Sequence, residues 1–283
     1  MTHRRGARVR RSNLDRETPR VDVPGALHGN RMPPLFTVTG RDVLFAHWPM
    51  DPDALSGHVP DALTLETFDG TAWVSVLALE NGAVGVGPTT PPASVGATPQ
   101  LNLRTYVTMD GDSGVYFLSL DTGRRVAALA GRRGFGLPFH HATMRLTRRD
   151  GRITFRSRRR GGATLAAHFG ARYHPVGPVF EADPGTIESF CVERFRFFFP
   201  AGEDRRVDAL QAGDGNHGGV RVGTVSREPW ELRPVEAEIR RNTLFEAAGL
   251  PRPTTEPVVQ YSPGFQMGVD PLETRDAADR RSG

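Results

Sequence analysis

Four side chains that could bind a small anion alternate along one predicted strand. The segment 99–107 alternates polar and apolar residues, which is typical of a strand with two different faces. One face carries two amides, a guanidinium and a phenol: Gln100, Asn102, Arg104 and Tyr106. A guanidinium keeps its charge and can grip a carboxylate with two parallel hydrogen bonds. We therefore expect Arg104 to hold an anion if this face lines a cavity, and to be a solvated residue if the face is open to water.

A second alternating segment, 114–121, follows the first after the turn-forming link 109–113. The two segments predict a hairpin. Phe117 from this hairpin and Trp73 from an earlier predicted strand are expected to shape the wall of the cavity. Tyr106 and His140 are the candidates for moving a proton, since both side chains can serve as general acids or bases.

The composition limits the chemistry, because all 36 basic residues are arginine. Without lysine the chain forms no lysine Schiff base and uses no lysine general base. Cys191 is the single cysteine, so no disulfide framework is expected. His140 and His141 are adjacent and would face opposite sides of a strand, so we expect neither a metal site nor a cofactor.

The positive charge is concentrated in two segments of a chain whose isoelectric point is about 9.9. Residues 1–33 are rich in arginine and lack hydrophobic periodicity, which predicts a disordered arm. The second cluster lies within 145–160, on a predicted hairpin that turns at Asp150-Gly151, and we interpret it as a solvated face. Nucleic-acid association through the arm is the less favoured alternative.

No apolar run approaches the roughly 20 residues needed to span a bilayer, and the N-terminus lacks the apolar segment of a secretory signal. We therefore expect a cytoplasmic protein with no membrane partner. Homo-oligomer formation is left open by the sequence.

Hairpins dominate the predicted elements. Turn signals at Asp69-Gly70, 109–113 and Asp150-Gly151 each separate two strand-like segments. Helices are expected from Asp51-Pro52, over 124–133, from Asp183 to about Arg194 and over 234–250. The pattern predicts an α+β, mainly β fold with a single domain over 34–273 and a charged tail over 274–283.

An ordered series of motifs resembles a known family over residues 36 to 273. The motifs include His47-Trp48-Pro49-Met50-Asp51-Pro52, Phe68-Asp69-Gly70, Asn102-Leu103-Arg104-Thr105-Tyr106-Val107, Glu193-Arg194-Phe195 and Tyr261-Ser262-Pro263-Gly264. They resemble the YqjF-like group of uncharacterised proteins, the domain of unknown function 2071.

This group is similar in fold to the acetoacetate decarboxylase superfamily. The resemblance implies a curved antiparallel sheet that forms a barrel around a cavity, with a few helices outside. The true decarboxylases use a lysine Schiff base, which this lysine-free chain cannot form. Gln100 also stands where the group commonly has glutamate. Both departures argue against Schiff-base decarboxylation.

The resulting expectation is a protein that binds a small carboxylate or another oxygenated metabolite in the barrel cavity. Arg104 would hold the anion, while Gln100, Asn102 and Tyr106 would supply hydrogen bonds. Lysine-independent acid–base catalysis and non-catalytic binding or sensing both fit these residues. A fold resemblance alone does not choose between them.

Overall fold

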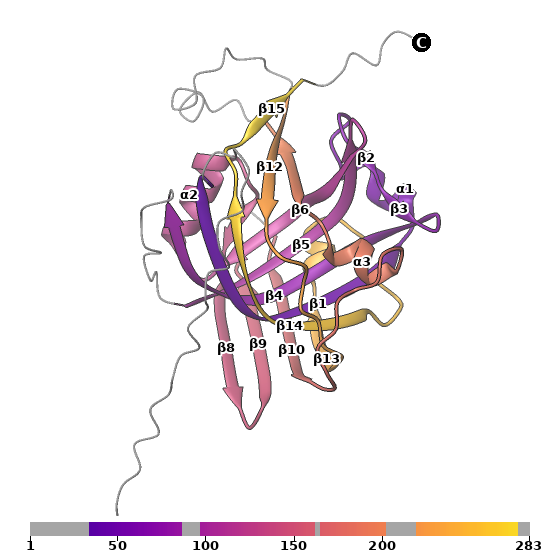
Figure 1. Cartoon of the computed structure of the whole chain (residues 1–283). Coiled ribbons are helices and arrows are strands. Elements are labelled where there is room, and N and C mark those ends of the chain that lie inside the picture. The colour runs from indigo at the N-terminus through magenta and orange to yellow at the C-terminus, as the bar shows by residue number, and fades with distance from the viewer. Residues whose placement is uncertain (1–33, 87–96, 162–164, 202–218, 277–283) are drawn as a thin grey trace, which may run out of the picture. The chain divides into compact units, whose positions relative to one another are not determined.

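Within the described residues, 34–86, 97–161, 165–201 and 219–276, eleven strands of the computed structural model form one large sheet, sheet A (Figure 1). Its strands are β1 (Phe36–Met50), β2 (Thr64–Leu65), β3 (Thr67–Phe68), β4 (Thr71–Val86), β5 (Thr98–Met109), β6 (Asp112–Thr122), β7 (Phe139–His141), β11 (Arg196–Pro200), β12 (Val220–Ser226), β14 (Val258–Val269) and β15 (Glu273–Arg275).

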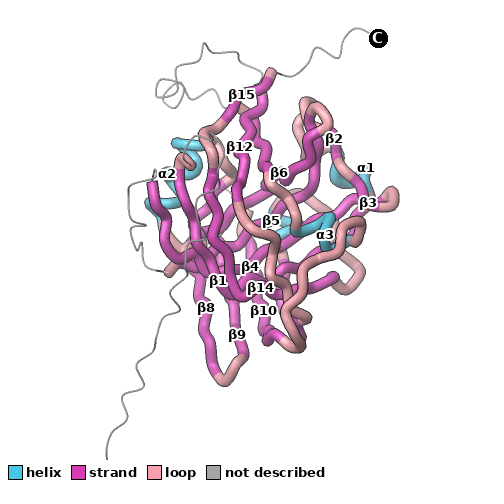
Figure 2. The backbone as a smooth tube through the Cα atoms, viewed as in Figure 1, coloured by secondary structure: helices cyan, strands magenta, loops and turns pink. Residues whose placement is uncertain are grey.

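Pairings within sheet A form a ring. The order β5-β4-β1-β14-β12-β11-β6 is closed by a further pairing of β6 with β5 (Figure 2). The expected mainly β fold with a curved sheet is therefore confirmed. The sheet is mixed, however, because β11 and β7 both run parallel to β6.

A second sheet, sheet B, consists of β8 (Thr143–Arg149), β9 (Arg152–Arg159), β10 (Ala167–Pro175) and β13 (Val235–Asn242) in the order β13-β10-β9-β8. It buries Phe155 and Phe169 in one core with Leu101 and Leu103 of β5. We call the face of sheet A that meets sheet B the outer face. The opposite, inner face forms a separate core with residues from 182 to 232. Because successive side chains of a strand alternate, polar residues of β5 that lie between these leucines point inward.

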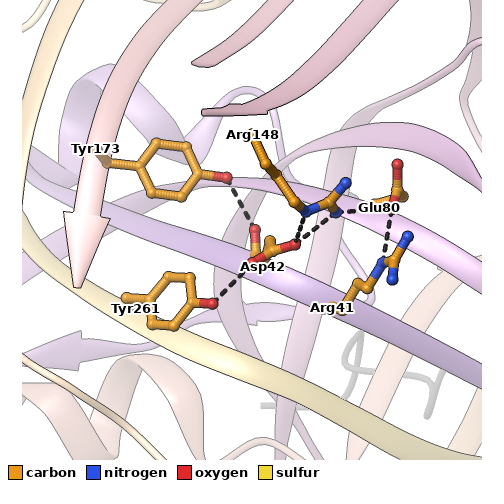
Figure 3. A network of polar contacts seen from close by, with 6 residues as sticks. All are labelled: Arg41, Asp42, Glu80, Arg148, Tyr173 and Tyr261. Carbon is orange, nitrogen blue, oxygen red and sulfur yellow. Dashed lines mark hydrogen bonds and ion pairs between the residues drawn. The ribbon is translucent and has the colours of Figure 1, made fainter. Parts of the chain in front are cut away.

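Polar contacts at Asp42 tie the two sheets together on the outer face (Figure 3). Arg148 of sheet B donates to Asp42 over 2.5 Å and to Glu80 over 2.7 Å. The Tyr261 hydroxyl donates to the Asp42 carboxylate over 2.7 Å, and the Tyr173 hydroxyl donates to the Asp42 carbonyl over 2.9 Å. Both carboxylates and the guanidinium are thus partnered.

Three predicted hairpin turns are confirmed by the backbone. Asp69, Asp110 and Asp150 each have a positive φ of about 50°, and each precedes a glycine whose φ is also positive. Two successive positive φ values define the turn whose twist matches that of paired strands. The Asp-Gly pairs therefore set the register of β3–β4, β5–β6 and β8–β9.

The described helices are short. They are α1 (Pro52–Ser56), α2 (Arg125–Phe135), α3 (Ile187–Val192) and α5 (Leu244–Ala247). The Asp51 side chain accepts a hydrogen bond from the Asp53 backbone, as the predicted N-cap requires. The helix expected from Asp183 begins later, because Thr186 caps α3 by accepting from Ser189.

The helix predicted over 234–250 is wrong. Val235–Asn242 is the strand β13, and only Leu244–Ala247 is helical. Val235, Ala237 and Ile239 are half-buried against the core while the glutamates between them are exposed. That spacing of two residues is the period of a strand, and it outweighs the good helix propensity of Ala and Glu.

The predicted arm over 1–33 lies outside the described residues. The described ones belong to one compact unit, Pro33–Gly283. Thr274 and Arg275, which the sequence prediction assigned to the tail, are part of β15. No described helix combines the length and apolar character required to cross a bilayer.

Candidate anion-binding site

A chain of buried hydrogen bonds crosses the inner face of β14, β1, β4 and β5. His47 Nε2 lies 2.9 Å from Gln260 Oε1, and His47 Nδ1 lies 2.5 Å from Ser75 Oγ. Ser75 Oγ also hydrogen-bonds to the Tyr106 hydroxyl. These four side chains are at most 3% exposed. Because the Gln260 oxygen can only accept, Nε2 is the protonated nitrogen in this arrangement and Nδ1 accepts from Ser75.

The four side chains of this hydrogen-bond network are uncharged at neutral pH. Burial and the positive charge of Arg104 lower the pKa of His47 to about 3. Burial raises the pKa of Tyr106, so its hydroxyl keeps its proton. The hydrogen-bond network therefore places neutral donors and acceptors beside the fixed positive charge of Arg104.

Strand register explains why these residues meet. His47 follows Val43 and Phe45 at two-residue intervals on the inner face of β1. It lies directly opposite Ser75, and Ser75 lies directly opposite Arg104. Side chains opposite each other in an antiparallel pair are separated by about 5 Å at Cβ, close enough for these contacts.

Arg104 lies at the Tyr106 end of this hydrogen-bond network, and it is 8% exposed. Its Nη2 donates to the Cys191 carbonyl over 2.8 Å. The Tyr106 hydroxyl lies 3.0 Å from the same carbonyl and shares its single proton between that oxygen and Ser75 Oγ, because the Ser75 proton goes to His47. The buried Nε of Arg104 has no hydrogen-bond partner, and neither has the buried Nε1 of Trp73, two residues before Ser75 on the same face. The inner face thus carries two buried donors without an acceptor.

The charges around Arg104 do not balance. Arg194 and Arg227, both less than 10% exposed, are paired with Glu66 over 2.8 Å and with Glu193 over 2.9 Å. Burial lowers the pKa of Arg227, Glu193 raises it, and the positive charge of Arg104 lowers it further. The guanidiniums of Arg104 and Arg194 both lie near the Tyr106 ring, so the three share one region. Arg104 itself forms no ion pair with any described residue.

Glu188 does not supply the missing charge as an ion pair. Burial is the largest cause that raises the pKa of the Cys191 thiol to about 12, and the negative charge of Glu188 on α3 also raises it. It forms no ion pair within the ranges that the structure describes. Glu193 is engaged by Arg227 and by the Trp230 backbone, so its carboxylate does not pair with Arg104.

The sequence-predicted ligand-binding residues share the inner face. Gln100 donates to the Asn102 oxygen over 2.8 Å and accepts from Asn81, so the amides form a ladder along β5. Phe117 lies directly opposite Arg104 in the register of β5 and β6. The full set is Trp73, Gln100, Asn102, Arg104, Tyr106 and Phe117.

His140 is not brought together with them. It lies beside Asp121 in the pairing of β6 with β7. Asp121 faces sheet B, where Arg159 lies 3.3 Å away. Burial and the charges of Arg159 and Arg132 lower the pKa of His140 to about 4. Proton transfer by His140 at the site of Arg104 stays a prediction.

The sequence prediction did not assign three residues, His47, Ser75 and Gln260, to this site. The alternation of Val43, Phe45 and His47 was a signal that could have placed the histidine on a buried face. Gln260 is 213 residues from His47, and no local pattern announces the pairing of β1 with β14. No described group of His, Cys, Asp and Glu could hold a metal ion.

Comparison of the sequence with known proteins identifies its family. Residues 37–266 match domain of unknown function 2071, described as an uncharacterized conserved protein. The chain belongs to this family. It is 36% identical over 226 residues to the uncharacterized protein YqjF of Bacillus subtilis (strain 168), which covers 79% of this chain and 86% of that protein.

Solved structures extend the likeness to the acetoacetate decarboxylase fold. The enduracididine biosynthesis enzyme MppR complexed with pyruvate gives a TM-score of 0.58 at 12% identity, covering 89% of this chain and 94% of that one. Acetoacetate decarboxylase from Legionella pneumophila subsp. pneumophila str. Philadelphia 1 gives 0.57 at 13% identity, covering 95% and 98%. The expected fold relationship is confirmed, and at these identities it concerns the fold alone.

Proposed function

We propose that this protein binds a small carboxylate on the inner face of sheet A, with Arg104 as the anion-binding group. The observation that carries the proposal is the missing ion pair: of three guanidiniums with buried side chains, those of Arg194 and Arg227 are paired with carboxylates and that of Arg104 is not. A guanidinium cannot shed its proton at any physiological pH, so a bound anion is the remaining way to neutralise it.

The hydrogen-bond geometry supports a carboxylate in particular. The Nε of Arg104 needs an acceptor, and so does the Nε1 of Trp73 on the adjacent strand. A charge-assisted hydrogen bond from Arg104 to a carboxylate is worth about 1.5–3 kcal/mol. Three hollows of 260 to 660 Å³ lie beside sheet B and α2, and Arg104 lines none of them. The proposal therefore rests on charge and unmet hydrogen bonds.

The fold neighbours agree with this ligand class. One of them is described in complex with pyruvate, which is a small carboxylate. That complex belongs to a protein only 12% identical to this chain, so it supports the class of ligand and no particular contact.

The uncharged hydrogen-bond network next to Arg104 suits a carbonyl oxygen that such a ligand carries besides its carboxylate. Tyr106 could donate its proton to a carbonyl oxygen of the ligand, because the Ser75 proton is already given to His47. Such proton donation needs no lysine. Binding without turnover, as in a sensor, uses the same contacts.

The test is ligand-dependent thermal stabilisation. Pyruvate and acetoacetate should raise the melting temperature, while pyruvamide, which lacks the charge, should not. Arg104→Met should abolish the effect, and Arg252→Met, which removes the same charge from an exposed loop residue, should keep it. Equal stabilisation of the Arg104→Met protein would overturn the proposal. Loss of pyruvate or acetoacetate over time, followed by NMR, separates turnover from binding.

A further inference from the structure

Sheet B turns a second group of arginines toward solvent, on the side away from the core. Along β9, Ile153, Phe155 and Ser157 are buried, while Arg156 and Arg158, which alternate with them, are exposed. Several exposed arginines of this solvent face form no ion pair within the described ranges, among them Arg145, Arg156, Arg158 and Arg241. They make a concentrated positive surface that the site at Arg104 does not use.

Strand register aligns these charges in a row. Arg145 lies directly opposite Arg156, Arg156 lies opposite Gly170, and Gly170 lies opposite Arg241. Like charges directly opposite each other destabilise a sheet. Burial lowers the pKa of His168 in the adjacent row, and the charges of Arg241 and Arg158 lower it further. The positive potential is therefore felt by neighbouring side chains.

A hollow of about 380 Å³ lies over this row. Gly170 leaves its middle open, since a Cβ added there would meet no atom within 4 Å. Four neighbouring strands span about 14 Å, so a compact ligand can reach arginines from three of them at once.

We propose that this hollow binds a compact small molecule that carries several phosphate groups. Guanidiniums match phosphate oxygens in the same forked geometry that they offer to carboxylates. Glu236 and Glu238 are exposed on β13, where they would repel a long polyanion running across the sheet. The aromatic residues that line the hollow, Phe155 and Phe169, are at most 2% exposed and give nucleic-acid bases no stacking surface.

The test is calorimetric titration of the full chain with inorganic tripolyphosphate and with orthophosphate at fixed ionic strength. We expect tripolyphosphate to bind more tightly than orthophosphate. The double variant Arg156→Gln/Arg241→Gln should weaken binding by at least about tenfold, because it removes two charge-assisted contacts. Gly170→Val keeps every charge and fills the hollow, and it should also weaken binding. Arg252→Gln is the control for net charge and should bind as the wild type does.

The proposal is independent of the inner face, so Arg104→Met should leave tripolyphosphate affinity unchanged. Absence of tripolyphosphate binding would overturn it, as would equal affinity in the Arg156→Gln/Arg241→Gln and wild-type proteins. Binding of duplex DNA or heparin whose affinity grows with polymer length and exceeds that for tripolyphosphate would also overturn it, in favour of an extended polyanion.

Discussion

The two faces of sheet A differ in how their arginines are paired with acids. On the outer face Arg148 meets two carboxylates, Asp42 and Glu80 (Figure 3). Arg159 on the same face lies 3.3 Å from Asp121. On the inner face Arg104 meets only a backbone carbonyl. An arginine matched by acids joins elements of the fold, whereas one that is left unmatched is available to a ligand.

The difference has an energetic signature. Removing an arginine that is paired with acids leaves their carboxylates without a partner where water solvates them poorly. Removing an arginine without an acidic partner leaves no carboxylate unpaired. Replacing a matched arginine should therefore lower the free energy of unfolding, whereas replacing Arg104 should leave it nearly unchanged or raise it.

The largest effect is expected from Arg148→Met. Removing one partner of a buried ion pair costs about 3–5 kcal/mol, and we expect about 2–3 kcal/mol here because Arg148 is 37% exposed and Glu80 keeps Arg41. Urea unfolding measures the loss. Arg149→Met, at the neighbouring and 93% exposed position, is the control and should change stability by less than about 0.5 kcal/mol. Equal changes in the free energy of unfolding of the two variants would show that the Arg148 contacts do not stabilise the fold.

Acid should destabilise the inner face through His47. Its pKa in the folded protein is about 3, against 6.5 in the unfolded chain, so the unfolded chain binds the proton first as the pH falls below 6.5. Between pH 7 and pH 5 this costs about 2 kcal/mol of unfolding free energy. The decline should be smaller by that amount in His47→Gln. An identical pH dependence in both proteins would show that His47 is not held neutral.

Asp121 on the outer face should act in the opposite sense. Burial raises its pKa from 3.8 to about 6 despite the charge of Arg159, so the folded protein takes up the proton first as the pH falls through 6. Acidification from pH 7 to pH 5 should therefore contribute about 1 kcal/mol of stability. Comparing wild-type and Asp121→Asn unfolding at the two pH values isolates this gain, and a loss in its place would reverse the assignment.

The smallest effect on stability is expected from Arg104→Met. Replacing an unmatched buried cation by an apolar side chain of similar length should leave the unfolding free energy within about 1 kcal/mol of the wild type or raise it. Chemical denaturation without added carboxylate measures this. A loss as large as that of Arg148→Met would mean that Arg104 is a structural residue.

Local sequence signals predicted much of this arrangement. The Asp-Gly turns and the alternation in 99–107 placed Gln100, Asn102, Arg104 and Tyr106 on one face of β5, because turn geometry and strand period are local properties. The prediction failed at 234–250, because it gave the helix propensity of alanine and glutamate more weight than the alternation of Val235, Ala237 and Ile239 that β13 follows.

Long-range pairing accounts for what the sequence could not show. The contact of His47 with Gln260 depends on β1 pairing with β14, and the charge balance depends on Glu66 and Glu193 finding Arg194 and Arg227. The sequence contains more acids than these, so it could not reveal that Arg104 is the cation left over.

A crystal structure of the protein grown with pyruvate tests the central claim most directly. We predict a carboxylate oxygen within about 3 Å of the Arg104 Nε, on the inner face beside Trp73. An Arg104 that instead pairs with an acidic side chain of its own chain, with no pyruvate on the inner face, would contradict it.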